Sequence, residues 1–336
     1  MKFQLKSFLQ YTLITLVGGF FLYYVFKDTQ WADLFFRIKS AHLSWLFVGL
    51  GVGMVSHWLR AYRATFLYQA MGYEVSTLNS FYSVLIGYMM NYVIPRAGEI
   101  SRCAALTKTD QMPIEKSLGT VVTERIVDLL LLLVVLGTIF ILQFQIISEF
   151  IAKSLKLGHL EVGQGFHLKW ILGLSVLVFL AIVYRARKYI ASHPVYLKLV
   201  IIFEGFADGL LSIRHVKKPA VFIILSFLIW ACYILMMYFC LLAMDATSEL
   251  LFSDCLVVFA IGTLGVVIPA PGAGAGTYHF FVMQSLLLFG VAREDGIAYA
   301  TMVHGAQMIL LTILGLIASV FVMLQHKKIK TDEQTA

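Results

Sequence analysis

Long runs without aspartate, glutamate, lysine or arginine recur along this 336-residue sequence. They cover Ser7–Phe26, Thr77–Pro95, Pro219–Met244, Cys255–Ala292 and Ile297–Gln325. A helix needs about 20 consecutive apolar residues to cross the hydrocarbon core of a bilayer. The runs therefore predict an all-α, polytopic helical membrane protein.

The deficit of charge extends over the whole chain. Hydrophobic residues make up 60% of the sequence and charged residues 13%, whereas soluble domains carry about 25% charged residues. We therefore predict a single transmembrane domain over residues 1–326, followed by a cytoplasmic tail over 327–336. The four cysteines lack CxxC spacing, so they predict packing positions and neither a metal site nor a cofactor.

The basic residues indicate the topology, because lysine and arginine are enriched in cytoplasmic loops. Both ends of the chain and the segment 185–218 are basic, whereas 243–253 contains acidic residues and no basic one. The net charge of +7 follows from this pattern, and no nucleic-acid partner is expected. Both termini are predicted in the cytoplasm. The six full spans predicted from these anchors cover 7–26, 43–62, 117–142, 166–184, 219–242 and 297–325.

Two further apolar segments, 77–110 and 254–292, must each enter and leave on one side. The second is interrupted by Pro269 and Pro271 and by glycines at 272, 274 and 276. Proline and glycine break a helix, and the flanks on either side are each shorter than a full crossing. Both segments are therefore predicted to be re-entrant broken hairpins. The segment 194–213 mixes apolar and charged residues and predicts a helix on the cytoplasmic interface.

The two breaks have similar sequences. Residues 93–98 and 267–272 both read V-I-P-x-x-G at the end of an apolar half-segment. Each lies in the third membrane element of its half, and the two halves enter from opposite faces. Inverted repeats with broken helices that meet near the midplane are typical of secondary transporters. We therefore predict an inverted repeat, with halves 1–142 and 166–326.

Ionisable residues near the first break are costly in a membrane and need partners or a wet cavity. They are Arg96, Glu99, Arg102, Glu124, Arg125 and Asp128. Glu124 and Asp128 are four residues apart, which places both carboxylates on one helix face. Two interpretations are open: a salt-bridge cluster that holds the hairpin to its neighbour, or the lining of a cleft for a phosphate group. Arg60 and Arg63 are expected to be interface anchors, with contact to a lipid headgroup as the alternative.

The second break offers other candidates. Its glycines predict either uncovered backbone amides that bind an anion or close helix packing. Residues 255–292 contain no aspartate, glutamate, lysine or arginine, and His279 is their one histidine. It could bind a proton or contact a lipid headgroup. His304 and Gln307, three residues apart on the last helix, could face it.

These motifs resemble the lysylphosphatidylglycerol synthase transmembrane region, a flippase-like family, over about residues 10–325. The resemblance is carried by N-Y-V-I-P-R-A-G-E-I-S-R at 91–102, E-R-x-x-D at 124–128 and P-x-P-G at 269–272. Ala273 interrupts a double glycine common in the family, and Tyr278 with His279 replaces a region that is often acidic. The predicted substrate-binding set is Asn91, Arg96, Glu99, Arg102, Glu124, Arg125, Asp128, Gly272, Gly274, Gly276, Tyr278 and His279, and the predicted structural breaks are Pro95, Gly98, Pro269 and Pro271.

The resemblance implies movement of a phospholipid, or of an aminoacyl- or glycolipid, between leaflets of the bacterial inner membrane. The soluble domain of the full synthase is not in the sequence, so no enzymatic activity is expected. Two other functions stay open: a non-transporting membrane partner of an envelope glycosyltransferase or lipid-modifying enzyme, and an enzyme that acts on lipid headgroups. The predicted partner is a membrane lipid; the oligomeric state does not follow from the sequence.

Overall fold

The structure is a computed structural model, and it describes residues 2–94, 97–148, 216–268 and 270–335. Twelve helices lie in these residues. They are α1 (Lys2–Phe26), α2 (Trp31–Lys39), α3 (Leu43–Ala70), α4 (Thr77–Val93), α5 (Ala97–Asp110), α6 (Ile114–Leu142), α10 (Pro219–Leu241), α11 (Asp245–Ser248), α12 (Phe252–Val267), α13 (Pro271–Gly274), α14 (Thr277–Leu287) and α15 (Arg293–Thr335). The predicted all-α class is confirmed for these residues. The predicted span 166–184 and the interface helix 194–213 lie outside the described residues.

Several described helices have the length and apolarity to cross a bilayer. Within the described ranges they are α6, α10 and the part of α15 from Arg293 to Lys327. The pair α2 and α3, bent by 82°, adds a fourth if it counts as one broken span. This composition makes the chain a multi-pass membrane protein.

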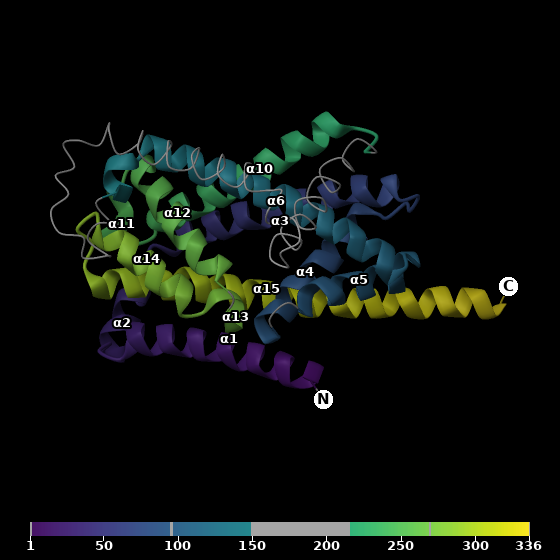
Figure 1. The fold of residues 1–336 in the computed structure, drawn as a ribbon, viewed down its shortest axis with the longest axis horizontal. Coiled ribbons are helices and arrows are strands. Elements are labelled where there is room, and N and C mark those ends of the chain that lie inside the picture. The colour runs from purple at the N-terminus through teal and green to yellow at the C-terminus, as the bar shows by residue number, and fades with distance from the viewer. Residues whose placement is uncertain (1, 95–96, 149–215, 269, 336) are drawn as a thin grey trace, which may run out of the picture.

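Most helices run along the long axis of the molecule (Figure 1). The short helices α2 and α11 lie at one end, and the C-terminus lies at the other. Local sequence explains several boundaries. The Ser76 side chain accepts a hydrogen bond from the Asn79 amide, 3.1 Å away, at the start of α4. Pro219 occupies the first turn of α10, where its missing donor costs nothing.

The first hairpin is formed by α4 and α5, which pack tightly through glycine. A Cβ on Gly98 would lie 2.2 Å from the Gly87 carbonyl oxygen, so the two helices are in backbone contact. The Asn91 side chain accepts a hydrogen bond from the Gly98 amide at 2.8 Å. Asn91 and Gly98 therefore fix the geometry of the hairpin tip, while Pro95 and Arg96 lie outside the described residues.

The second hairpin is formed by α12, α13 and α14. A Cβ on Gly265 of α12 would lie 2.8 Å from the Thr277 carbonyl oxygen. The Thr277 hydroxyl donates to the Gly265 carbonyl at 2.6 Å. This hairpin too is closed by direct backbone contact near its tip, so both apolar segments predicted to be broken are broken.

The tip of the second hairpin is a left-handed turn. Gly272, Gly274 and Gly276 have φ of 62°, 99° and 89°, and Ala273 between them has φ of 52°. Glycine adopts this conformation at little cost, whereas a residue with a Cβ costs about 1–2 kcal/mol there. Ala273 is thus the strained position of the turn, at the place where the sequence departs from a double glycine.

Replacing Ala273 with glycine is expected to stabilise the protein by about 1 kcal/mol, because the left-handed conformation then loses its steric cost. The midpoint of unfolding in detergent, titrated with sodium dodecyl sulfate, measures the effect. Ala275→Gly is the matched control, because Ala275 has φ of −55°, and there glycine should destabilise by about 0.5–1 kcal/mol. Equal effects from both substitutions would contradict the assignment of strain.

The two hairpins approach each other from opposite ends of the molecule (Figure 1). The turn α13 packs against α4 of the first hairpin and against α1. A Cβ on Gly18 of α1 would lie 2.7 Å from the Pro271 ring. Irregular backbone at the second tip is therefore covered by protein, as it must be inside a bilayer.

Candidate functional site

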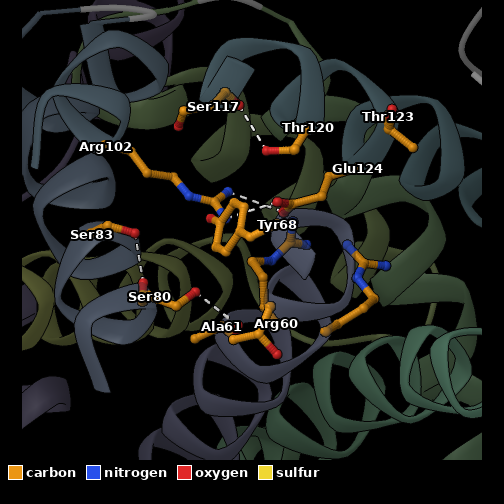
Figure 2. Close-up of polar contacts among 12 residues, drawn as sticks. Arg60, Ala61, Tyr68, Ser80, Ser83, Arg102, Ser117, Thr120, Thr123 and Glu124 are labelled. Carbon is orange, nitrogen blue, oxygen red and sulfur yellow. Dashed lines mark hydrogen bonds and ion pairs between the residues drawn. The ribbon is translucent and has the colours of Figure 1, made fainter. Parts of the chain in front are cut away.

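A buried ion pair links the first hairpin to the following helix. Arg102 on α5 donates from its two terminal nitrogens to the two carboxylate oxygens of Glu124 on α6, at 3.0 and 2.8 Å. The same guanidinium donates to the Tyr68 hydroxyl of α3 at 2.8 Å. Figure 2 shows the Arg102 side chain crossing to Glu124 beside the Tyr68 ring. Glu124 is 1% exposed, so this pair joins three helices in the interior.

A second cluster lies along the same face of α6. Asp128 accepts from Arg60 at 2.6 Å with one oxygen and from Arg63 at 2.9 Å with the other. Both arginines belong to α3. Arg60 also donates to the Tyr233 hydroxyl at 2.9 Å, and Arg63 donates to the Ser226 hydroxyl at 2.9 Å. Both of these acceptors belong to α10, so the cluster joins α3, α6 and α10.

The helical period of α6 explains why its three charges have different surroundings. Glu124 and Asp128 are four residues apart and both are buried, as the sequence predicted, whereas Arg125 between them points outward and its side chain is 54% exposed. Residues 129–142 after this turn are uncharged, so the two carboxylates lie near the first half of the helix. Their geometry is that of a salt-bridge network between helices.

Glu99 takes a different position from Arg102, although only three residues separate them. One Glu99 carboxylate oxygen accepts from Arg125 at 3.2 Å in a pair open to the surroundings. The other oxygen is buried, and it has no hydrogen-bond partner among the described residues. Glu99 therefore lies at the boundary between the surface and the network.

The expectation that Arg60 and Arg63 anchor the helix at the interface is wrong. Arg63 is fully buried, and Arg60 is 6% exposed. Helix α3 continues to Ala70, beyond the predicted end at residue 62. Arg60 and Arg63 are three residues apart, and this spacing places them on one helix face. That spacing, together with the two carboxylates of α6, was the available signal for a buried cluster.

The amides of Gly274 and Gly276 in the glycine turn already donate to acceptors within the protein. Gly274 donates to the Ala270 carbonyl at 3.4 Å, and Gly276 donates to the His279 ring at 3.3 Å. An anion would have to displace these acceptors. The small residues also allow the close contact with α1, which is the packing interpretation of the glycines.

His279 and His304 lie together beside this turn, as their sequence positions suggested. Their ring centroids are 5.2 Å apart, and Tyr278 lies 5.2 Å from His304. Both histidines are buried. The His279 ring accepts a hydrogen bond from the Gly276 amide at 3.3 Å. The histidines thus hold the left-handed turn against α15, and a role in contacting substrate stays a prediction.

Two surface depressions lie away from the buried charges, at the end of the molecule that contains α2. Their charged lining residues are Asp28, Asp33, Arg37, Asp245, Arg293, Glu294 and Asp295. Arg37 of α2 is paired there with Asp33 and Asp295. The pair with Asp295 attaches α2 to α15, and these two helices pack together beside the depressions.

An apolar helical bundle with two glycine-closed hairpins and a buried charged network defines a multi-pass membrane protein. The family model described as the lysylphosphatidylglycerol synthase TM region matches residues 10–315. The chain belongs to this family, as the sequence motifs predicted. It is 24% identical over 280 residues to a UPF0104 membrane protein of Methanocaldococcus jannaschii, covering 77% of this chain and 79% of that protein. No solved structure matches the chain.

Proposed function

We propose that the protein moves a phospholipid, or an aminoacyl- or glycolipid, between the leaflets of the bacterial inner membrane. The proposal is supported by membership of a flippase-like transmembrane family. The matched region is the transmembrane part of a synthase, and a non-enzymatic role is proposed for it here. The membrane lipid is the proposed partner.

The proposed topology has six full spans and two re-entrant hairpins, arranged as an inverted repeat with both termini in the cytoplasm. Two contacts support it. The tip α13 of the second hairpin packs on α4 of the first, as expected if opposed hairpins meet in the interior. Helices α3 and α10, which would be equivalent in the two halves, pack so closely that a Cβ on Gly49 would lie 2.6 Å from the Cys240 sulfur.

The observation that carries the proposal is the charged network inside an apolar bundle, beside the tip of the first hairpin. Charged side chains inside a membrane protein mark substrate or ion pathways, because their burial is otherwise costly. Arg102 and Glu124 bind the hairpin to α6, and Glu99 keeps one oxygen without a partner in the described parts of the chain. We propose that this oxygen accepts from a donor of the lipid headgroup.

The proposed path for the headgroup runs between the two tips. On the first tip it would pass Asn91 and Glu99, with Arg125 at its open side. Arg96, which lies outside the described residues, stays a predicted member of the path. On the second tip it would pass the glycine turn, Tyr278 and His279. The lipid chains would stay in the bilayer, where the exposed apolar faces of the helices lie.

Purified protein in lipid vesicles tests the proposal. Protein-containing vesicles are expected to expose an inner-leaflet fluorescent phospholipid to an external quencher faster than protein-free vesicles. Glu99→Gln removes the carboxylate charge with little change in shape, and it is expected to slow the exposure on the order of tenfold, the effect of about 1.4 kcal/mol. Equal rates for the wild type and protein-free vesicles would remove the proposed function.

The matched control is Glu249→Gln. Glu249 is also a glutamate, but it is exposed next to the short helix α11 and far along the chain from either tip. Its substitution should leave the rate unchanged. A folded Glu99→Gln protein that moves lipid at the wild-type rate would show that Glu99 is outside the path.

A further inference from the structure

The cluster on α3 carries an imbalance of charge. Arg60 and Arg63 share the single carboxylate of Asp128, one on each oxygen. Arg102 and Glu124 form a balanced pair beside it. Among the described residues, the network therefore holds three arginines and two carboxylates, and its excess of one positive charge lies at Arg60 and Arg63.

Such an excess is unfavourable in a buried position. Removing an ion from water costs several kcal/mol even after relaxation, and an arginine inside a membrane protein is normally paired or placed in a wet cavity. Arg63 is fully buried and stacks on the Phe222 ring at 5.5 Å. Its Nε has no hydrogen-bond partner in the described ranges. A bound anion would neutralise this excess positive charge.

The groups around Arg60 are rich in hydrogen-bond donors. Beyond Asp128, Arg60 directs its Nε and one Nη at the Tyr233 hydroxyl, which leaves the hydroxyl hydrogen free to donate. The His57 ring lies 4.6 Å from the Tyr88 ring, and its buried Nδ1 has no partner in the part of the chain that the structure describes.

Three side chains of this region are partly exposed. His57, Tyr88 and Tyr233 are half-buried, and they come from α3, α4 and α10. Helices α4 and α10 both pack against α3. A ligand that reaches Arg60 would approach it along these side chains.

We infer that Arg60, with Arg63 and Tyr233, forms a binding site for a phosphate-type oxyanion. A phosphodiester carries one negative charge, which equals the local excess. Its two free oxygens match the Nε and Nη pair of Arg60. This pair now donates to the Tyr233 hydroxyl, which would move aside and donate to one of the phosphate oxygens. The lipid form of this ligand rests on the proposed function, whereas binding of free phosphate does not.

Binding to purified protein in a non-ionic detergent tests the site. The probes are inorganic phosphate, short-chain dihexanoylphosphatidylglycerol, and uncharged dihexanoylglycerol. The wild type is expected to be stabilised against heat, in a saturable way, by the phosphodiester lipid and not by dihexanoylglycerol. Stabilisation by inorganic phosphate as well would show that the oxyanion alone suffices; stabilisation by the lipid alone would identify the headgroup as the ligand.

The decisive variant is Arg60→Gln, which removes the excess charge and leaves Arg63 paired with Asp128. Its affinity for the phosphodiester is expected to fall by about tenfold or more, since a hydrogen bond to a charged group is worth at least that factor. Without ligand it should be as stable as the wild type, which a purely structural arginine would not allow. Lys39→Gln, which removes an exposed cation of α2, is the control and should bind as the wild type does.

Wild-type affinity in Arg60→Gln, or no saturable binding of either phosphate probe to the wild type, would overturn the inference. Should Arg60→Gln fail to fold, Tyr233→Phe gives a second reading, because loss of one hydroxyl is expected to weaken binding severalfold. If the protein binds the lipid but does not move it, the binding site is supported and the proposed transport is contradicted. If the Arg60→Gln variant no longer binds the phosphodiester but moves lipid at the wild-type rate, the binding site is supported and is not part of the transport path.

Discussion

Replacing Asp128 with asparagine is expected to leave most of the purified protein unfolded in detergent. Asparagine keeps the shape of the side chain but removes the charge that Arg60 and Arg63 share. Breaking one buried ion pair costs about 3–5 kcal/mol, because the remaining charge stays buried without a partner, and here two arginines are affected. The midpoint of unfolding in sodium dodecyl sulfate, followed by circular dichroism, measures the loss.

Asp245→Asn is the control for that substitution. Asp245 pairs with His42 at 2.9 Å, but its side chain is 86% exposed. Exposed pairs contribute about 0–1 kcal/mol, so this variant should unfold at nearly the wild-type midpoint. An Asp128→Asn protein as stable as Asp245→Asn would mean that water reaches the arginines freely, and the buried network would then be wrong.

The second large effect is expected from Glu124→Gln. This change removes the charge that balances Arg102 in the interior and should cost about 3–5 kcal/mol. The adjacent residue gives the comparison, because Arg125→Gln disrupts only the exposed pair with Glu99 and should cost about 0–1 kcal/mol. Unfolding midpoints of the two purified variants measure the difference between neighbours in sequence.

A double substitution separates lost pairing from lost packing. In Arg102→Met with Glu124→Leu, both charges leave the interior and apolar side chains of similar size replace them. Replacing both members of a buried pair is often neutral or stabilising, so the double variant should recover most of the stability lost in Glu124→Gln. A double variant less stable than Glu124→Gln would contradict the explanation that Glu124→Gln is destabilised by the unpaired charge of Arg102.

The sequence predicted the helical class and both breaks because those features are local. Uncharged runs and proline–glycine clusters leave few options in a bilayer. The spacing of four residues likewise predicted that Glu124 and Asp128 share one helix face. The six-span topology and the inverted repeat stay predictions, since the structure shows three to four candidate spans within its described residues.

The partners of the charged residues could not be predicted from spacing alone. Glu99 and Arg102 could share a face, yet Arg102 turns inward to Glu124 and Glu99 turns to Arg125. An isolated arginine is costly in lipid, and this cost favours a surface position for Arg60 and Arg63. Pairing with Asp128 offsets the cost of burying the two arginines. This pairing joins residues that are 65 and 68 positions apart in the chain, so local spacing does not predict it.

The contact between α1 and the tip of the second hairpin has a mechanical consequence. A Cβ on Gly276 would lie 2.7 Å from the Gly18 carbonyl oxygen and 2.8 Å from the Leu22 amide, so main chain rests on main chain with no side chain between them. A side chain can change rotamer to absorb a displacement, whereas bare backbone cannot. We therefore expect α1 and the left-handed turn to move together as one rigid body.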